Sequence, residues 1–138
     1  MHAYPIRLHD NGTWATARDI PEFNTAGNGD TETIANAVDG LITALSFYQD
    51  RSQKMPVASE PQAGEVLIHI PTLEAAKIAL WNEMVEQGIN KASLARRLGV
   101  SATSAGRLAS ILYSSRIEVV ENALLALGKR LSVVTEAS

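Results

Sequence analysis

Residues 90–108 have the sequence NKASLARRLGVSATSAGRL, in which small and apolar residues follow the spacing of a helix-turn-helix. Leu94 and Leu98 are one helical turn apart and are expected to point toward a core. Ala95 is small where a second helix would cross the first, and Gly99 can adopt the left-handed conformation that a tight turn needs. The segment therefore predicts two short helices joined at residue 99.

The second of these helices is expected to begin after Ser101, whose hydroxyl can cap it. Val100 is expected to fill the angle between the two helices, and Ala105 and Leu108 are expected to form the inward face of the second. The outward face, near the N-terminal end, is left with Ala102, Thr103, Ser104 and Arg107. In a helix-turn-helix, residues at these positions enter the major groove of DNA.

The outward side chains have the chemistry that contact with a DNA duplex requires. The hydroxyls of Thr103 and Ser104 can bond base edges or phosphate, and the Arg107 guanidinium can bond guanine in bidentate fashion. Three basic residues of the first helix are candidates for phosphate contact, together with free backbone N–H groups at the helix starts. The predicted DNA-binding residues are Lys91, Arg96, Arg97, Ser101, Ala102, Thr103, Ser104 and Arg107. A helical domain without a nucleic-acid role is the alternative.

A closing helix and a short tail are predicted after this motif. Residues 115–118, SRIE, have the sequence of a capping box, and the helix is expected to stop at Gly128. Its buried stripe is expected to consist of Ile117, Val120, Leu124 and Leu127. Leu131, Val133 and Thr135 then alternate in the tail, which predicts a strand that pairs with a second copy across a two-fold axis.

The first 26 residues predict three β-strands. Residues 4–8 alternate between large apolar and polar or small side chains, residues 10–12 supply a turn, and residues 13–18 form the second strand of a hairpin. A third strand is expected over residues 23–26, before a glycine-rich turn. Pro5 cannot donate a ladder hydrogen bond, so it is expected to face an open edge or to lie outside the pairing.

A long amphipathic helix is expected next, capped by Asp30 or Thr31. Gly40 within it indicates close packing of the backbone. After an aperiodic connection over residues 51–64, alternation over residues 66–70 predicts a fourth strand. The apolar stripe of the helix is expected to consist of Ile34, Val38, Leu41, Ile42, Leu45 and Tyr48.

Residues 71–87 predict a further helix, buried on more than one side and ended by Gly88. The order of elements is βββαβ followed by short helices, which predicts an α+β fold with one helix over one face of a small sheet. We therefore expect one domain over residues 1–71 and a second, all-helical domain over residues 72–138.

The charges of the chain are divided unequally between these two parts. The formal net charge is −3, but residues 1–71 carry −5, residues 72–138 carry +2, and residues 90–130 alone carry +5. This division indicates that the basic part binds phosphate groups and that the acidic part binds a basic partner. The chain has no cysteine, which excludes a disulfide framework and a thiolate nucleophile. With no secretion signal and no apolar run of membrane-spanning length, we expect a cytoplasmic protein.

The order of several short motifs resembles the HicB antitoxins of type II toxin–antitoxin systems. These motifs are YPI at residues 4–6, DIPEF at 19–23, GDT at 29–31, LARRLG at 94–99 and ALGK at 126–129. The resemblance extends over nearly the whole chain. Two features depart from it: residues 28–29 lengthen the turn before the long helix, and the residues of the recognition helix are particular to this chain.

The resemblance implies a truncated RNase H-like domain over residues 1–71 that binds and blocks HicA, a small, basic, mRNA-cleaving toxin. It also implies that the C-terminal domain binds the operator of its own operon as a homodimer or a higher even oligomer. Some HicB antitoxins carry a ribbon-helix-helix in place of this domain. The expectation of a Cro/repressor-like helix-turn-helix therefore depends on residues 90–108.

Two other functions are open alternatives: a regulator that senses a small ligand, and a degenerate nuclease. Asp10, Asp19 and Glu22 could match the carboxylates with which RNase H-like nucleases bind Mg²⁺. We reject catalysis as the main interpretation, because two of them lie in turn contexts that explain them and the short sheet lacks further inward acids. No metal or cofactor site is expected from the scattered histidines, His2, His9 and His69.

Overall fold

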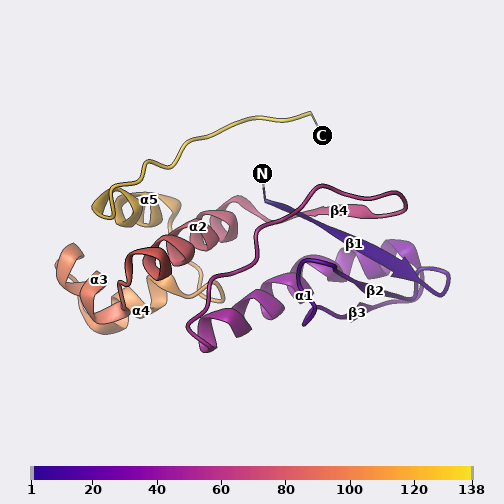
Figure 1. Ribbon diagram of the computed structural model, residues 1–138, viewed down its shortest axis with the longest axis horizontal. Coiled ribbons are helices and arrows are strands. Elements are labelled where there is room, and N and C mark those ends of the chain that lie inside the picture. The colour runs from indigo at the N-terminus through magenta and orange to yellow at the C-terminus, as the bar shows by residue number, and fades with distance from the viewer. Residues whose placement is uncertain (1, 138) are drawn as a thin grey trace.

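The computed structural model describes residues 2–137 and has a four-stranded antiparallel sheet followed by a helical bundle (Figure 1). The strands, in the order β3-β2-β1-β4, are β1 (Ala3–His9), β2 (Trp14–Thr16), β3 (Thr25–Ala26) and β4 (Val66–His69). The helices are α1 (Asp30–Asp50), α2 (Thr72–Gln87), α3 (Lys91–Leu98), α4 (Ala102–Ala109) and α5 (Ile117–Ala126). The predicted α+β order of βββαβ followed by helices is confirmed.

Pro5 lies in β1, which pairs with β2 on one side and with β4 on the other. The Ile70 N–H donates to the His2 carbonyl at 2.8 Å, so residues 2 and 70 form a hydrogen-bonded pair. Hydrogen-bonded and non-hydrogen-bonded pairs alternate along an antiparallel ladder. Pro5 therefore occupies a non-hydrogen-bonded position opposite Leu67. Its nitrogen points toward β2, whose pairing with β1 starts only at Arg7. The expectation that Pro5 faces an open edge or lies outside the pairing is therefore met only on the β2 side, because Pro5 lies within the β1–β4 ladder of an inner strand.

Helix α1 packs on one face of the sheet, and the two elements build the core of this part of the chain. Gly40 permits close contact there, because a Cβ at this position would lie 3.0 Å from Cε1 of Phe23. The fully buried residues include Ile6, Ala15, Ala37, Leu41 and Leu45. The predicted stripe is partly displaced, since Ile34, Val38, Ile42 and Tyr48 are only half-buried.

The third strand is shorter than predicted. Phe23 is buried but precedes β3, because its N–H donates to the Ile20 carbonyl at 2.9 Å and closes a turn. The predicted second strand over residues 13–18 is likewise reduced to β2. In both cases the ladder ends after a few residues: β2 pairs with β1 only over Trp14–Thr16, and β3 pairs with β2 only over Thr25–Ala26.

The start of α1 differs from the prediction of a side-chain cap. The N-cap is Gly29, which offers no side chain, and Asp30 is already the first residue of the helix. The first turn is instead bound by another part of the chain. The Thr33 hydroxyl donates a buried hydrogen bond to the Gly12 carbonyl at 2.6 Å. The β1–β2 turn therefore anchors the first turn of α1 through the Thr33 side chain.

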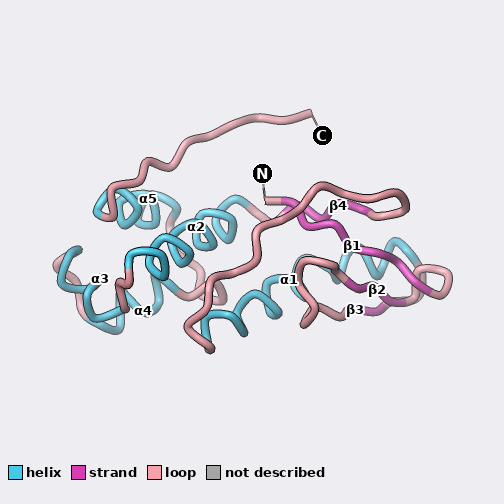
Figure 2. The backbone as a smooth tube through the Cα atoms, in the orientation of Figure 1, coloured by secondary structure: helices cyan, strands magenta, loops and turns pink. Residues whose placement is uncertain are grey.

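The connection over residues 51–65 runs back along the molecule toward β4 (Figure 2). It is tied to the segment that follows β2 by Glu65, whose side chain is 1% exposed. Arg18 donates to it twice, from Nε at 3.0 Å and from Nη2 at 2.8 Å, and the Gln62 N–H donates at 2.7 Å. Hydrogen bonds from Arg18, and next from the Gln62 backbone, lower the pKa of Glu65 from 4.5 to about 2.

This pKa predicts how stability responds to acid. A carboxylate whose pKa is lower in the folded than in the unfolded state stabilises the fold above pH 4.5, and that contribution is lost as the pH falls toward about 2. The Glu65→Gln variant lacks it, so its Tm should lie below that of the wild type at pH 6 and approach it at pH 2. Thermal unfolding followed by circular dichroism from pH 2 to 6 measures this. A Tm difference that does not change with pH would contradict it.

Helix α2 has the predicted bounds and is buried on more than one side, and Gly88 ends it in the left-handed conformation with φ 68°. It also joins the two halves of the chain. Trp81 Nε1 donates to the Gln53 carbonyl at 2.7 Å, and Asn82 exchanges two hydrogen bonds with the backbone of Met55. A single cluster of buried apolar residues accordingly continues from the sheet into the bundle.

The capping box predicted for α5 is wrong. Its N-cap is Arg116, without a side-chain hydrogen bond, and the Ser115 hydroxyl accepts a hydrogen bond from Lys77 instead. The rest of the helix follows the prediction more closely, since Val120, Leu124 and Leu127 are buried and Ile117 is half-buried. A partner distant in the sequence has taken the hydroxyl that the local pattern assigned to a cap.

The tail after α5 forms no strand in the single chain. Residues 129–137 are irregular, and the tail extends away from the bundle (Figure 1). Leu131 packs against the core, whereas Val133 and Val134 are exposed. A strand needs a partner, and within the described residues nothing pairs with this segment; pairing with a second copy stays a prediction.

Candidate nucleic-acid interface

The turn between α3 and α4 has the geometry that the sequence predicts. The Asn90 side chain accepts the Ser93 N–H at 2.8 Å and caps α3. Gly99 ends this helix in the left-handed conformation with φ 67°. Leu94 and Ala95 are buried, so α3 packs on the bundle with the face that was predicted to point inward.

Helix α4 also begins as predicted. The Ser104 N–H donates to the Ser101 hydroxyl at 3.1 Å, and Ala105 and Leu108 are buried. Val100 is an exception, because its side chain is 44% exposed and does not fill the angle between the helices. Its N–H donates to the Ala95 carbonyl, and this backbone bond closes the turn without any contribution from the side chain.

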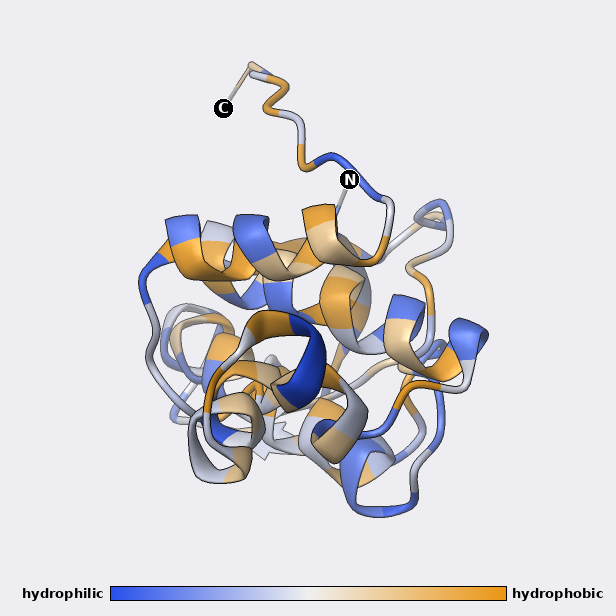
Figure 3. Ribbon diagram, turned by 90° about the vertical axis from the view of Figure 1, so that its left-hand side faces the viewer, coloured by the Kyte–Doolittle hydropathy of each residue, from blue (hydrophilic) through white to orange (hydrophobic). Residues whose placement is uncertain are grey.

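The predicted DNA-binding residues all lie on the exposed surface of these two helices. Figure 3 faces the end of the molecule at which α3 and α4 lie, and a strongly hydrophilic helical turn occupies the middle of this view. Lys91 lies close to α4, because its Cδ is 3.8 Å from the position of a Cβ at Gly106. The exposed residues are Lys91, Arg96, Arg97, Ser101, Ala102, Thr103, Ser104 and Arg107.

Two residues of the described chain lie beside Arg107 and were not predicted from the sequence. The Arg107 guanidinium carbon lies 5.1 Å from the centre of the Tyr113 ring, in the range of a cation–π contact. Lys77 of α2 is fully buried and donates to the Arg107 carbonyl at 3.2 Å. The sequence indicated a special role for Lys77 only in that this lysine lies between apolar residues of a helix expected to be buried on several sides. No local pattern indicated that Tyr113 would lie beside Arg107.

Lys77 holds several backbone groups at the end of α4. Its ammonium also donates to the Ser110 carbonyl at 2.9 Å, to the Tyr113 carbonyl and to the Ser115 hydroxyl at 2.9 Å. Burial lowers the pKa of Lys77 from 10.5 to about 8, while the nearby Glu74 opposes the shift. A buried cation with four oxygen partners satisfies carbonyls that the end of a helix leaves free.

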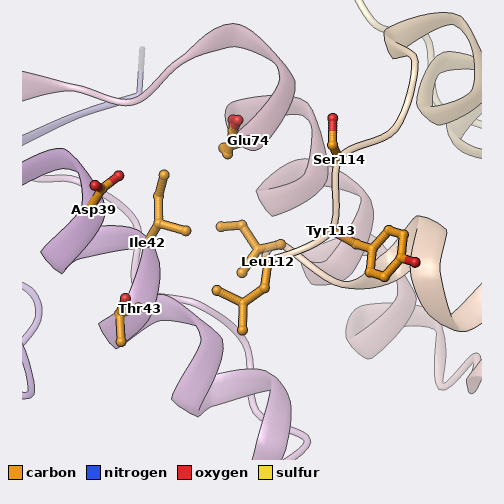
Figure 4. A pocket seen from close by; sticks show the side chains of 8 residues that line it. Asp39, Ile42, Thr43, Glu74, Leu112, Tyr113 and Ser114 are labelled. Atoms are coloured by element: carbon orange, nitrogen blue, oxygen red, sulfur yellow. The ribbon is translucent and has the colours of Figure 1, made fainter.

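A pocket of about 320 Å³ lies between α1 and the connection that follows α4 (Figure 4). Ile42 and Leu112 point into it, whereas the Tyr113 ring points away from it. One carboxylate oxygen of Glu74 is buried there without a hydrogen-bond partner among the described residues. None of the predicted DNA-binding residues lines this pocket, whose walls are Asp39, Ile42, Thr43, Glu74, Ile111, Leu112, Tyr113 and Ser114.

The carboxylates that could have matched a nuclease are each used elsewhere. Asp10 accepts a hydrogen bond from Trp14 Nε1 at 2.8 Å, and Asp19 accepts from the backbone N–H and the hydroxyl of Ser59. Glu22 accepts from the Tyr48 hydroxyl and Arg51. Residues 2–137 contain no group of three His, Asp or Glu side chains that could hold a metal ion, and no helix among them could span a membrane.

Comparison with known proteins adds evidence independent of this geometry. A family model described as the HicB-like antitoxin of bacterial toxin–antitoxin systems matches residues 3–79. The chain is 38% identical to Antitoxin HicB of Pseudomonas fluorescens (strain Pf0-1), with 100% of this chain and 97% of that protein covered. It is 33% identical to Antitoxin HicB of Escherichia coli (strain K12), with coverage of 95% and 97%. The chain therefore belongs to the HicB-like antitoxin family.

Proposed function

We propose that this chain is a non-enzymatic antitoxin that neutralises a HicA-type, mRNA-cleaving toxin by direct binding and represses its own operon. The toxin-binding part is residues 1–71 and the DNA-binding part is residues 72–138. Family membership supports the antitoxin role. The net charge of −5 on residues 1–71 suits a small basic partner in the cytoplasm.

The turn at Gly99, between the two capped helices α3 and α4, is the main support for operator binding. It leaves the hydroxyl and guanidinium groups of α4 exposed at one end of the molecule, beside the basic residues of α3. Helices of this kind commonly read two half-sites, so the working form is a homodimer or a higher even oligomer. The exposed tail, with Val133 and Val134, is the segment proposed to join two copies.

Co-expression with the product of the adjacent gene tests the antitoxin role. The toxin alone should arrest growth, and the full-length chain should restore growth and co-purify with the toxin. The Arg96→Ala and Arg107→Ala variants are matched controls, because both lie on the DNA-binding surface and should protect as well as the wild type. Operator binding without any protection from a neighbouring gene product would favour a ligand-sensing regulator.

Two arginines of the DNA-binding surface should differ in their effects. Arg107→Ala should weaken operator binding by about 1–3 kcal/mol and relax base preference at one position, because a guanidinium that bonds guanine carries sequence information. Arg96→Ala should weaken binding to all sequences alike, as expected for a phosphate contact. Fluorescence anisotropy on the operator and on single-base variants measures both. An equal loss on every duplex would exclude Arg107 as a base reader.

A further inference from the structure

The connection over residues 110–116, between α4 and α5, carries an aromatic ring that faces the recognition helix. The Tyr113 ring centre lies 5.1 Å from the guanidinium carbon of Arg107. Tyr113 is 47% exposed, and Arg107 is exposed as well. An arginine on a helix surface has many rotamers, and an aromatic face restricts the guanidinium to those that lie over it.

The backbone that carries this ring is held by a buried cation. Lys77 Nζ donates to the carbonyls of Ser110 and Tyr113 and to the Ser115 hydroxyl. The same ammonium donates to the Arg107 carbonyl at 3.2 Å. Lys77 therefore ties the residue that bears the ring and the residue that bears the guanidinium to one point.

A second side chain fixes the start of the connection from α1. Gln49 Nε2 donates to the Ala109 carbonyl at 2.7 Å, and Gln49 Oε1 accepts the Ile111 N–H at 3.0 Å. Both amide groups of one side chain thus bind backbone on either side of the C-cap, Ser110. Two side chains that are distant in the sequence, Lys77 and Gln49, therefore hold the backbone that carries the Tyr113 ring.

We propose that Tyr113 is a positioning residue for base reading by Arg107. By holding the guanidinium over its ring, Tyr113 reduces the rotamer freedom that Arg107 loses when it bonds a base edge. This inference rests on the proposed operator binding and deepens it, because it assigns part of the sequence preference to a residue outside the helix-turn-helix. An exposed cation–π contact of the usual strength corresponds to about a two- to fivefold change in affinity.

The test is a double-mutant cycle in the full-length chain. The probe is a duplex recovered from a random-sequence pool by the wild-type protein, and Kd is measured for the wild type, Tyr113→Ala, Arg107→Ala and the double variant. Tyr113→Ala should weaken binding about two- to fivefold. It should add nothing in the Arg107→Ala background, because the guanidinium through which it acts is absent. Tyr113→Phe keeps the ring and should bind as the wild type does.

Leu112→Ala is the matched control. Leu112 is the neighbouring residue of the same connection, is 63% exposed and points into the pocket between α1 and the connection (Figure 4). It should leave Kd unchanged. Because both side chains are exposed, neither alanine variant should lower the Tm by more than a few degrees, which separates an effect on Arg107 from loss of the fold.

Four results would overturn the inference. A loss that persists when Arg107 is already alanine would mean that Tyr113 touches DNA or acts on α4 as a whole. An equal loss in Tyr113→Phe would assign the effect to the hydroxyl. If Arg107→Ala does not change Kd, or if the wild type recovers no duplex, base reading by Arg107 is wrong and the inference about Tyr113 is wrong with it. The first two results would contradict only the inference and would leave base reading by Arg107 intact.

Discussion

Replacing Gly12 with alanine is expected to lower the free energy of unfolding by about 2–5 kcal/mol. Gly12 has φ 76°, which an L-residue rarely adopts. An added Cβ would lie 1.6 Å from Oδ1 of Asp30 and 2.7 Å from the backbone nitrogen of Asp30. The carboxylate can rotate away, but the backbone nitrogen cannot move without shifting the first turn of α1. That shift would also strain the bond from Thr33 to the Gly12 carbonyl.

Gly88→Ala provides the matched control for this variant. Gly88 has a similar φ of 68°, but an added Cβ would meet nothing within 4 Å. Its expected cost is therefore only that of the left-handed conformation, about 1 kcal/mol. Urea denaturation followed by circular dichroism gives both free energies. Equal losses in the two variants would show that the contact with α1 does not matter.

The Leu94→Ala variant is expected to lose about 2–5 kcal/mol of stability and, with it, operator binding. Leu94 is completely buried in α3, so removing its side chain leaves a cavity where α3 packs on the bundle. The orientation of α4 depends on that packing, because α3 and α4 contact each other. We therefore expect DNA affinity to fall together with the unfolding free energy.

Leu125→Ala removes the same atoms from a side chain of α5 that is 47% exposed. Its expected effect on stability is within about 0.5 kcal/mol, since no cavity forms at the surface. Urea unfolding and anisotropy on the operator should be measured for both variants. If Leu94→Ala were as stable as Leu125→Ala, or bound DNA equally well, the packing of α3 would not set the position of the recognition helix.

Elements whose ends depend on neighbouring residues could be predicted from the sequence. The bounds of α2, the left-handed turn at Gly99 and the cap of α4 by Ser101 match the structure. In each case the stabilising contact lies within one or two turns of the chain, so local spacing is sufficient information. The exposure of Thr103 and Arg107 then follows from the helical repeat.

Features that depend on distant partners could not be predicted. Ser115 had the sequence of a cap, yet its hydroxyl accepts from Lys77. The side-chain cap expected at Asp30 is absent, and a bond from Thr33 to the β1–β2 turn anchors the first turn of α1 instead. At both positions a local rule competed with a contact from another element, and the tertiary contact prevailed.

The spacing of residues 90–108 and the order of the short motifs were enough, without coordinates, to indicate the helix-turn-helix and the antitoxin family. Only the tertiary structure showed that Lys77 and Gln49 hold the end of α4 and that Tyr113 lies over Arg107. The physical reason is that helix periodicity and capping act over a few residues. Lys77, in contrast, is buried against carbonyl groups such as that of Ser110, which is more than 30 residues away along the chain.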